Sequence, residues 1–184
     1  MRKGVGHCCR AGGPSEDLLG PTWTVDFVTL ANIARNMSSK PRIIVDTNVL
    51  VAATRNREGP SFALIQLVRT GRILMCCSPA LFLEYEDVLR RPEQRAASGL
   101  RVKDVDAILK ELAALLEPVL THYQWRPQLR DPSDEMVLEA AAYARVDGLV
   151  TYNLRDFLPA RRFGVSVLTP EQTFERFGIA TPRK

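Results

Sequence analysis

The feature that most constrains the fold of this chain is an alternation of short apolar runs with longer amphipathic runs, which begins at residue 41. Short apolar runs are typical of buried strands, and amphipathic runs are typical of helices. Their alternation predicts an α/β domain with a central, mainly parallel five-stranded sheet. The predicted strands span residues 43–46, 73–78, 118–123, 148–151 and 165–169, and the predicted helices span residues 61–71, 78–92, 102–117, 131–145 and 170–178.

The length of 184 residues and the 46% hydrophobic content suit one well-buried core. We expect a single domain over residues 41–184, preceded by a flexible extension over residues 1–40 that holds one short amphipathic helix within residues 25–37. Met37 is an alternative start of the chain. Because no apolar run is long enough to cross a membrane and the N-terminus lacks a secretory h-region, we expect a soluble cytoplasmic protein.

The four cysteines form two adjacent pairs, which is neither a zinc-ligand spacing nor a disulfide framework. We expect Cys76 and Cys77 to be free and buried, and Cys8 and Cys9 with His7 to form no metal site. The net charge of +4 comes from scattered Lys and Arg residues, and it permits a polyanionic partner without requiring one.

A carboxylate ends the first predicted strand, in the stretch RIIVDTNVLV over residues 42–51. Asp46 follows the apolar run, and Thr47 and Asn48 come next before the sequence becomes apolar again. Ligands of parallel sheets bind at the carboxyl ends of the strands, where Asp46 lies. Since a buried carboxylate without partners is costly, we expect Asp46 to meet hydrogen-bond donors, a counter-charge or a metal ion.

A second acidic segment is LFLEYEDVL, within the predicted helix over residues 78–92. Glu84 and Glu86 both flank the apolar stripe of this helix, and periodicity does not choose between them.

A third acidic segment is RDPSDEMVL, where Asp131 before Pro132 predicts a helix N-cap and places Asp134 at the third helical position. A carboxylate at that position is free to point outward toward a ligand.

The last acidic segment is LVTYNLRDF, in which an apolar strand ends at Thr151 and is followed by Asn153 and Asp156. The same order of an apolar strand and a Thr/Asn/Asp cluster therefore occurs twice in one small sheet. Converging carboxylates repel one another, and Mg²⁺ or Mn²⁺ with hard oxygen ligands would compensate this. Phosphodiester hydrolysis is the chemistry that needs such a site.

Two histidines for acid–base catalysis are not available, because His7 lies in the extension and His122 in a predicted strand, where we expect a structural role.

The segments IIVDTNVLV, SPALFLEYEDVLRRP and DPSDEMVLEAAAYARVDGLVTYNLRDF, in this order, resemble the PIN domain family, and specifically the bacterial PIN-type toxins of toxin–antitoxin systems. The resemblance covers about residues 42–170. It implies a PIN-like α/β/α sandwich and a Mg²⁺- or Mn²⁺-dependent endoribonuclease that cuts single-stranded RNA and leaves a 5′-phosphate and a 3′-hydroxyl. It also implies a homodimer and a cognate antitoxin protein as partner.

The resemblance assigns roles to individual residues and selects Glu84 over Glu86. The catalytic, metal-binding quartet of the family falls on Asp46, Glu84, Asp134 and Asp156. Related domains often have Asp at the position of Asn153, and the amide keeps an oxygen ligand while it removes a negative charge. The remaining expectations are that Thr47, Asn48, Thr151, Asn153 and Asp131 support the ligands and that Arg55 and Arg155 hold RNA phosphates.

A different class of function fits the same segments. The chain could have kept the sheet and lost strong metal binding, which would make it a catalytically weak or inactive module that binds RNA or protein. The effect of Mn²⁺ on thermal stability separates the two hypotheses, because only a working site is stabilised by the ion.

Overall fold

The computed structural model describes residues 40–122, 124 and 126–180. The predicted extension up to residue 39, with its short helix, His7, Cys8 and Cys9, lies outside the described residues. From Lys40 onward the chain forms one compact unit.

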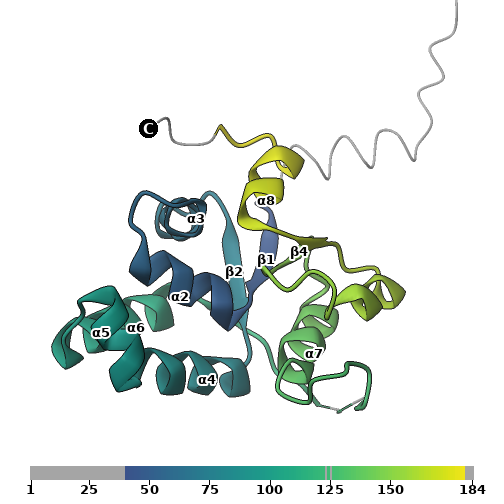
Figure 1. The fold of residues 1–184 in the computed structure, drawn as a ribbon. Coiled ribbons are helices and arrows are strands. Elements are labelled where there is room, and N and C mark those ends of the chain that lie inside the picture. The colour runs from purple at the N-terminus through teal and green to yellow at the C-terminus, as the bar shows by residue number, and fades with distance from the viewer. Residues whose placement is uncertain (1–39, 123, 125, 181–184) are drawn as a thin grey trace, which may run out of the picture. The chain divides into compact units, whose positions relative to one another are not determined.

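The described chain builds a sheet of five parallel strands in the order β3-β2-β1-β4-β5. Helices flank this sheet (Figure 1), and α7 packs against β1, β2 and β4 while α8 packs against β4 and β5. The predicted α/β/α fold with a central parallel sheet is therefore confirmed. The strands are β1 (Arg42–Val45), β2 (Leu74–Cys77), β3 (Glu117–Pro118), β4 (Gly148–Val150) and β5 (Val167–Leu168).

Most helices begin with the local chemistry that the sequence carries. The Ser78 hydroxyl accepts a hydrogen bond from the Leu81 N–H at 3.3 Å, and Pro79 occupies the first position of α4. Thr169 and Gln172 form a reciprocal capping box at the start of α8. The helices are α2 (Thr47–Arg55), α3 (Pro60–Arg69), α4 (Pro79–Arg90), α5 (Pro92–Ser98), α6 (Val102–Leu115), α7 (Glu135–Ala144) and α8 (Pro170–Arg176), with a 3₁₀ helix η1 (Leu158–Phe163).

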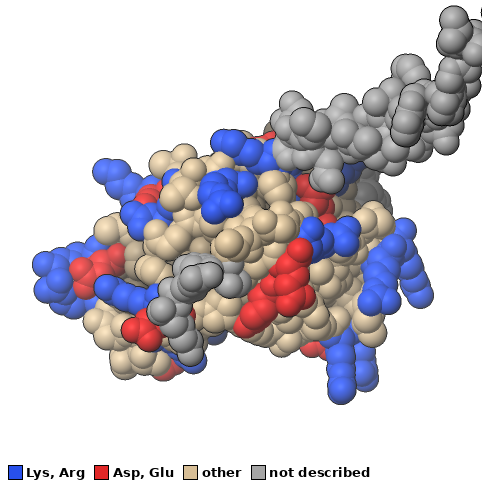
Figure 2. Space-filling view, turned by 90° about the horizontal axis from the view of Figure 1, so that it is seen from above, with Lys and Arg blue, Asp and Glu red and all other residues tan. Residues whose placement is uncertain are grey.

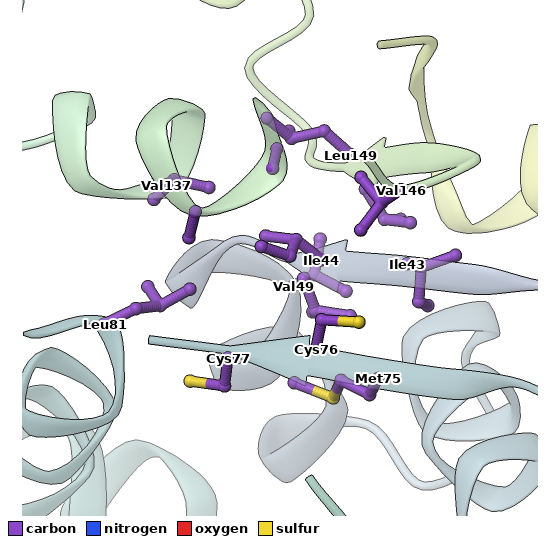
Figure 3. Close-up of a cluster of buried hydrophobic side chains, with 14 of the residues drawn as sticks. Ile43, Ile44, Val49, Met75, Cys76, Cys77, Leu81, Val137, Val146 and Leu149 are labelled. Carbon is purple, nitrogen blue, oxygen red and sulfur yellow. The ribbon is translucent and has the colours of Figure 1, made fainter. Parts of the chain in front are cut away.

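The hydrophobic core lies on β1 and β2 and under the helices that cover them (Figure 3). Ile43 and Ile44 of β1 are fully buried, as are Met75 and Cys76 of β2. Cys76 and Cys77 are free and buried, as predicted, and burial raises their thiol pKa values to about 11 and about 12. A core of this kind holds the carboxyl ends of the strands in fixed positions.

The surface charges are dispersed. Figure 2 shows Lys and Arg side chains in several separate groups, most of them near the outline of that face, with Asp or Glu beside several of them. In the described part of the chain, no helix combines the length and the apolar character that crossing a membrane requires.

Two sequence expectations about local structure are wrong, and two α-helices, α2 and α5, were not predicted. The third strand ends at Pro118 instead of continuing to residue 123, so His122 is exposed outside the sheet, where its ring lies edge-on to Tyr143 at a centroid distance of 6.3 Å. The N-cap of α7 is Asp134 and not Asp131, because the Asp131 carboxylate instead accepts hydrogen bonds from the N–H and hydroxyl of Ser133 in the preceding turn. The sequence also gave no indication of α5, which has no buried residue to create a periodic pattern.

Candidate active site

A cleft of about 600 Å³ begins at the carboxyl end of β1 and runs along α2. Asp46 and Asn153 follow the neighbouring strands β1 and β4, so parallel pairing brings them to the same edge of the sheet. Three acidic residues line the cleft, each from a different element: Asp46 after β1, Glu84 of α4 and Asp134 before α7.

Asp46 is held by a network of uncharged donors. Its backbone N–H donates to Val150 of β4 at 2.9 Å, and its side chain is 5% exposed. One carboxylate oxygen, Oδ2, accepts hydrogen bonds from Asn48 Nδ2 and Thr151 Oγ1, both at 2.6 Å. Burial raises the pKa of Asp46, while the Thr151 hydroxyl and the nearby backbone N–H groups of Asn48 and Thr47 act in the opposite direction.

The donors of this network are themselves oriented. Asn48 Oδ1 accepts a hydrogen bond from the Tyr152 N–H at 3.3 Å, which turns the amide nitrogen toward Asp46. The Asn153 N–H donates to Thr151 Oγ1 at 2.9 Å, so the hydroxyl hydrogen remains available for the carboxylate. The two Thr/Asn clusters recognised in the sequence thus meet across β1 and β4 and fix the Asp46 side chain.

Glu84 reaches the cleft because α4 is fixed against the end of β1. The neighbouring Tyr85 is fully buried, and its hydroxyl donates a hydrogen bond to the carbonyl of Val45, the last residue of β1. Glu86, the alternative that periodicity left open, lies outside the cleft lining and forms an ion pair with Arg90 at 3.0 Å.

Glu84 lacks the partners that a buried carboxylate normally has. Its Oε2 atom is buried without a well-formed hydrogen bond, and the buried Thr47 hydroxyl is a nearby donor. Burial raises the pKa of Glu84 and the charge of Asp46 adds to this effect, while Thr47 and the more distant Arg91 act in the opposite direction. A further ligand at this position would satisfy the unpaired oxygens.

The pKa of Asp134 is affected by the charges of four other acidic residues. Burial raises its pKa, and the charges of Asp46, Asp131, Asp156 and Glu84 raise it further, to about 6. No Lys or Arg within the described ranges forms an ion pair with Asp46, Glu84 or Asp134. The acidic end of the cleft therefore concentrates negative charge that no ion pair among the described residues offsets, although Arg55 lines the same cleft.

Of the other predicted site residues, Arg55 lines the cleft, whereas Asp156, Asp131 and Arg155 do not. Asp156 is exposed and is not part of the cleft lining, although its charge reaches Asp134, and its N–H donates to the carbonyl of Asn153 at 3.1 Å. Asp131 is exposed in the turn before Asp134. Arg55 lines the cleft, whereas Arg155 is exposed in the loop after β4 and is not part of the lining.

The donor set suits a hard divalent cation. The available ligands are carboxylate and amide oxygens, which Mg²⁺ and Mn²⁺ prefer, and Glu84 forms no ion pair with a described Lys or Arg. Within residues 40–180, apart from the two undescribed positions, no three His, Cys, Asp or Glu side chains converge into a preformed metal cage. An ion held by one or two carboxylates that retains part of its water shell fits this arrangement, as is common for Mg²⁺.

The sequence did not predict the far part of the cleft. Val88 of α4, Gln94 of α5 and Asn56 after α2 also line it. Helical spacing from Asn48 could have indicated Asn56, had α2 been recognised as a helix. Gln94 lies in a helix without buried residues, and nothing in its sequence neighbourhood indicated that it belongs to a site.

Comparison of the sequence with known protein families identifies the family of this chain. The profile of the PIN domain matches residues 42–155, which include β1, the segments around Glu84 and Asp134, and the loop after β4. A search of curated proteins finds no match. PIN domains are typically nucleases that depend on divalent metal ions, in agreement with the acidic cleft. Since the match covers more than half of its length, the chain belongs to the PIN domain family.

Proposed function

We propose that this protein is a Mg²⁺- or Mn²⁺-dependent endoribonuclease that cleaves single-stranded RNA. The observation that carries the proposal is the cleft in which Asp46, Glu84 and Asp134 form no ion pair with a described residue and in which Glu84 Oε2 has no well-formed hydrogen bond. Carboxylates arranged in this way would repel a polyanionic substrate unless a cation lay between them. The cation would activate water and neutralise charge on the phosphate.

The residues of the chain have distinct parts in this proposal. Among Asp46, Glu84 and Asp134, one or two carboxylates would hold the ion directly and the remainder through its water shell, and Asn153 would offer an amide oxygen beside them. Asn48 and Thr151 keep the Asp46 carboxylate in one orientation through their two hydrogen bonds of 2.6 Å. Arg55, at the other end of the cleft, would contact a flanking phosphate, which predicts binding that weakens with salt.

The ordered resemblance of the sequence to PIN-type toxins supports a more specific biological role. We infer that the protein is the toxin of a toxin–antitoxin pair, that a cognate antitoxin protein inhibits it and that it forms a homodimer. Because RNA is the proposed substrate, we also infer that the protein acts in the cytoplasm.

The test is incubation of the purified protein with a pool of RNAs, with and without Mn²⁺, followed by mapping of the cut ends. We expect Mn²⁺-dependent cuts that leave a 5′-phosphate and a 3′-hydroxyl. Asp46→Asn removes the charge at the centre of the cleft and keeps the shape of the side chain, and we expect it to slow cleavage at least about a thousandfold. Cleavage by a clean preparation of this variant at the wild-type rate would refute the proposal.

A catalytically weak or inactive PIN domain that binds RNA or protein is the second candidate. It is favoured by the absence of a preformed three-ligand cage among the described residues, by Asn153 in place of an acid and by the position of Asp156 outside the lining. RNA binding without cleavage, combined with no effect of Mn²⁺ on stability, would select this candidate.

A further inference from the structure

The cleft continues beyond its acidic end along one side of α2. Asn48, Val51, Ala52 and Arg55 all line it, and their spacing places them on a single face of the helix. With a rise of about 1.5 Å per residue, this face extends about 10 Å from Asn48 to Arg55. Val88 of α4 also lines the cleft. The helix α5, which carries Gln94, packs against both α2 and α4 (Figure 1).

Three polar side chains end the cleft on the far side: Arg55, Asn56 and Gln94. Arg55 donates a hydrogen bond to Gln94 Oε1, and the Glu58 N–H donates to Asn56 Oδ1 at 3.0 Å. Because a guanidinium and a backbone N–H can only donate, the amide oxygens of Gln94 and Asn56 must be the atoms that face them. Neither amide nitrogen forms a hydrogen bond with another described residue.

The far end of the cleft is therefore a site of hydrogen-bond donors. The guanidinium of Arg55 and the amide nitrogens of Asn56 and Gln94 offer N–H groups, whereas the oxygens of both amides are already engaged. The acidic end offers the opposite, namely carboxylate oxygens. Between the two ends, Val51, Ala52 and Val88 provide an aliphatic surface on which a planar ring could rest.

We propose that this far section is a nucleobase subsite that selects keto bases, guanine or uracil, next to the cleaved phosphate. Guanine presents O6 and N7 as neighbouring acceptors, and uracil presents O4, whereas adenine and cytosine present an exocyclic amino group at the corresponding position. An amino group facing the N–H groups of Gln94 and Asn56 would set donors against donors, so adenine and cytosine would lose the hydrogen bonds that guanine and uracil form there. Single-stranded RNA allows this readout, because its unstacked bases expose their edges.

This inference rests on the proposed ribonuclease function and deepens it, since it names the two amides that determine specificity. A randomised single-stranded RNA decamer is cut with the protein in Mn²⁺, and the new ends are sequenced. We expect guanine and uracil together to exceed adenine and cytosine by about fivefold or more at one fixed position beside the cut. An even distribution at every position would overturn the inference and leave the nuclease function intact.

A second arm keeps the subsite testable if no cleavage occurs. The same pool is bound in Mn²⁺, so that the acidic end of the cleft is compensated, and the retained molecules are sequenced; a subsite shows enrichment of guanine and uracil even without chemistry. Absence of cleavage in the first arm would count against the nuclease function, and absence of enrichment in the second arm would overturn the subsite.

Gln94→Glu provides the specific variant, because it replaces the amide nitrogen with an oxygen that accepts hydrogen bonds. We expect the preference to fall toward equality or to shift toward adenine and cytosine, and Asn56→Asp should act in the same direction. Gln66→Glu is the matched control: Gln66 of α3 also accepts a hydrogen bond from an arginine, Arg69, at 3.1 Å, but it does not line the cleft. Melting curves verify that each variant is folded. Unchanged base preference in both folded cleft variants would refute the role of the amides.

Discussion

Two neighbouring acidic residues, Asp134 and Glu135, show how the same kind of side chain can serve stability or a binding site. Glu135 is 1% exposed, and its Oε1 accepts hydrogen bonds from the backbone N–H groups of Gln128 and Leu129 at 2.5 and 2.8 Å. One turn later in α7, the buried Glu139 accepts two hydrogen bonds from the guanidinium of Arg126, at 3.2 and 3.1 Å. We call Glu135, Glu139 and Arg126 the paired cluster.

Asp134, Glu84 and Asp46 form the contrasting group, which we call the open cluster. Neutral donors contact Asp46, no ion pair forms with any of the three among the described residues, and all three have raised pKa values. The two groups differ in their partners: Arg126 forms an ion pair with the buried Glu139 and backbone N–H groups hold Glu135 Oε1, although Glu135 Oε2 is unpartnered, whereas no ion pair forms with the acids that line the cleft. A metal ion from solution is the natural compensation for the second case.

The largest change in stability is expected from breaking the paired cluster. Arg126→Gln leaves the charge of Glu139 buried without its counter-charge, and we expect a loss of about 3 kcal/mol in the free energy of unfolding, measured by urea denaturation. Arg130→Gln is the control, because Arg130 is an exposed arginine of the same segment and should change stability by less than about 0.5 kcal/mol. Equal effects of the two substitutions would show that the ion pair is not what stabilises this segment.

Addition of Mn²⁺ should stabilise the open cluster. At ten times the dissociation constant, binding to the native state alone adds about 1.4 kcal/mol to the free energy of unfolding. Thermal melting with increasing Mn²⁺ measures this shift, and we expect Asp46→Asn to remove most of it. A wild-type protein whose melting temperature does not respond to Mn²⁺ would favour the inactive binding module.

Asp134→Asn should stabilise the protein without metal, because it removes a charge from the open cluster. The pKa of Asp134 is raised to about 6 in the folded state, so its ionisation disfavours the native state as pH rises from about 4 to about 6. We expect the variant to exceed the wild type by about 1 kcal/mol at pH 8, after allowance for solvent screening, and to equal it below pH 4. Urea titrations at pH 3.5 and pH 8 measure both values. A variant less stable than wild type at pH 8 would show that Asp134 has a structural role.

The smallest effect is expected from Asn153→Asp, which adds a negative charge beside Asp46. We expect Mn²⁺ to bind a few times more tightly, as calorimetry can measure, and the metal-free protein to lose a few tenths of a kcal/mol through repulsion. Tighter binding of the ion accompanied by faster cleavage would identify Asn153 as the residue that limits the metal site. Weaker binding would mean that the amide oxygen of Asn153 is not near the ion.

Much of the fold could be predicted because local sequence patterns coincide with the final packing. β1 was predicted at residues 43–46 and is observed at Arg42–Val45, and α4 begins at the predicted Ser78 and Pro79. The helix α2 was missed because the polar residues Thr47 and Asn48, which line the cleft, interrupt its apolar periodicity. The residues that the cleft requires at the start of α2 therefore removed the sequence pattern by which this helix could have been predicted.

The length of the third strand was overestimated, because here a local sequence pattern was present and the tertiary pairing was not. The segment over residues 118–123 has a strand-like composition, but β3 pairs only with β2, through Cys76 and Cys77, and ends at Pro118. A strand at the edge of a sheet extends only as far as its single neighbour can provide hydrogen bonds. Composition does not contain that information.

The sequence by itself determined the α/β class, most of the strands and helices and the acidic residues that follow or flank them, because propensity, capping and periodicity are local properties. Periodicity left Glu84 and Glu86 open and the family resemblance selected Glu84, whereas only the tertiary structure decided that Asp156 lies outside the cleft lining and that Gln94 and Asn56 close its far end. The physical reason is that electrostatic interaction and desolvation depend on distance in space and on burial, and residues such as Asp46 and Asp134 become neighbours only after the sheet has formed.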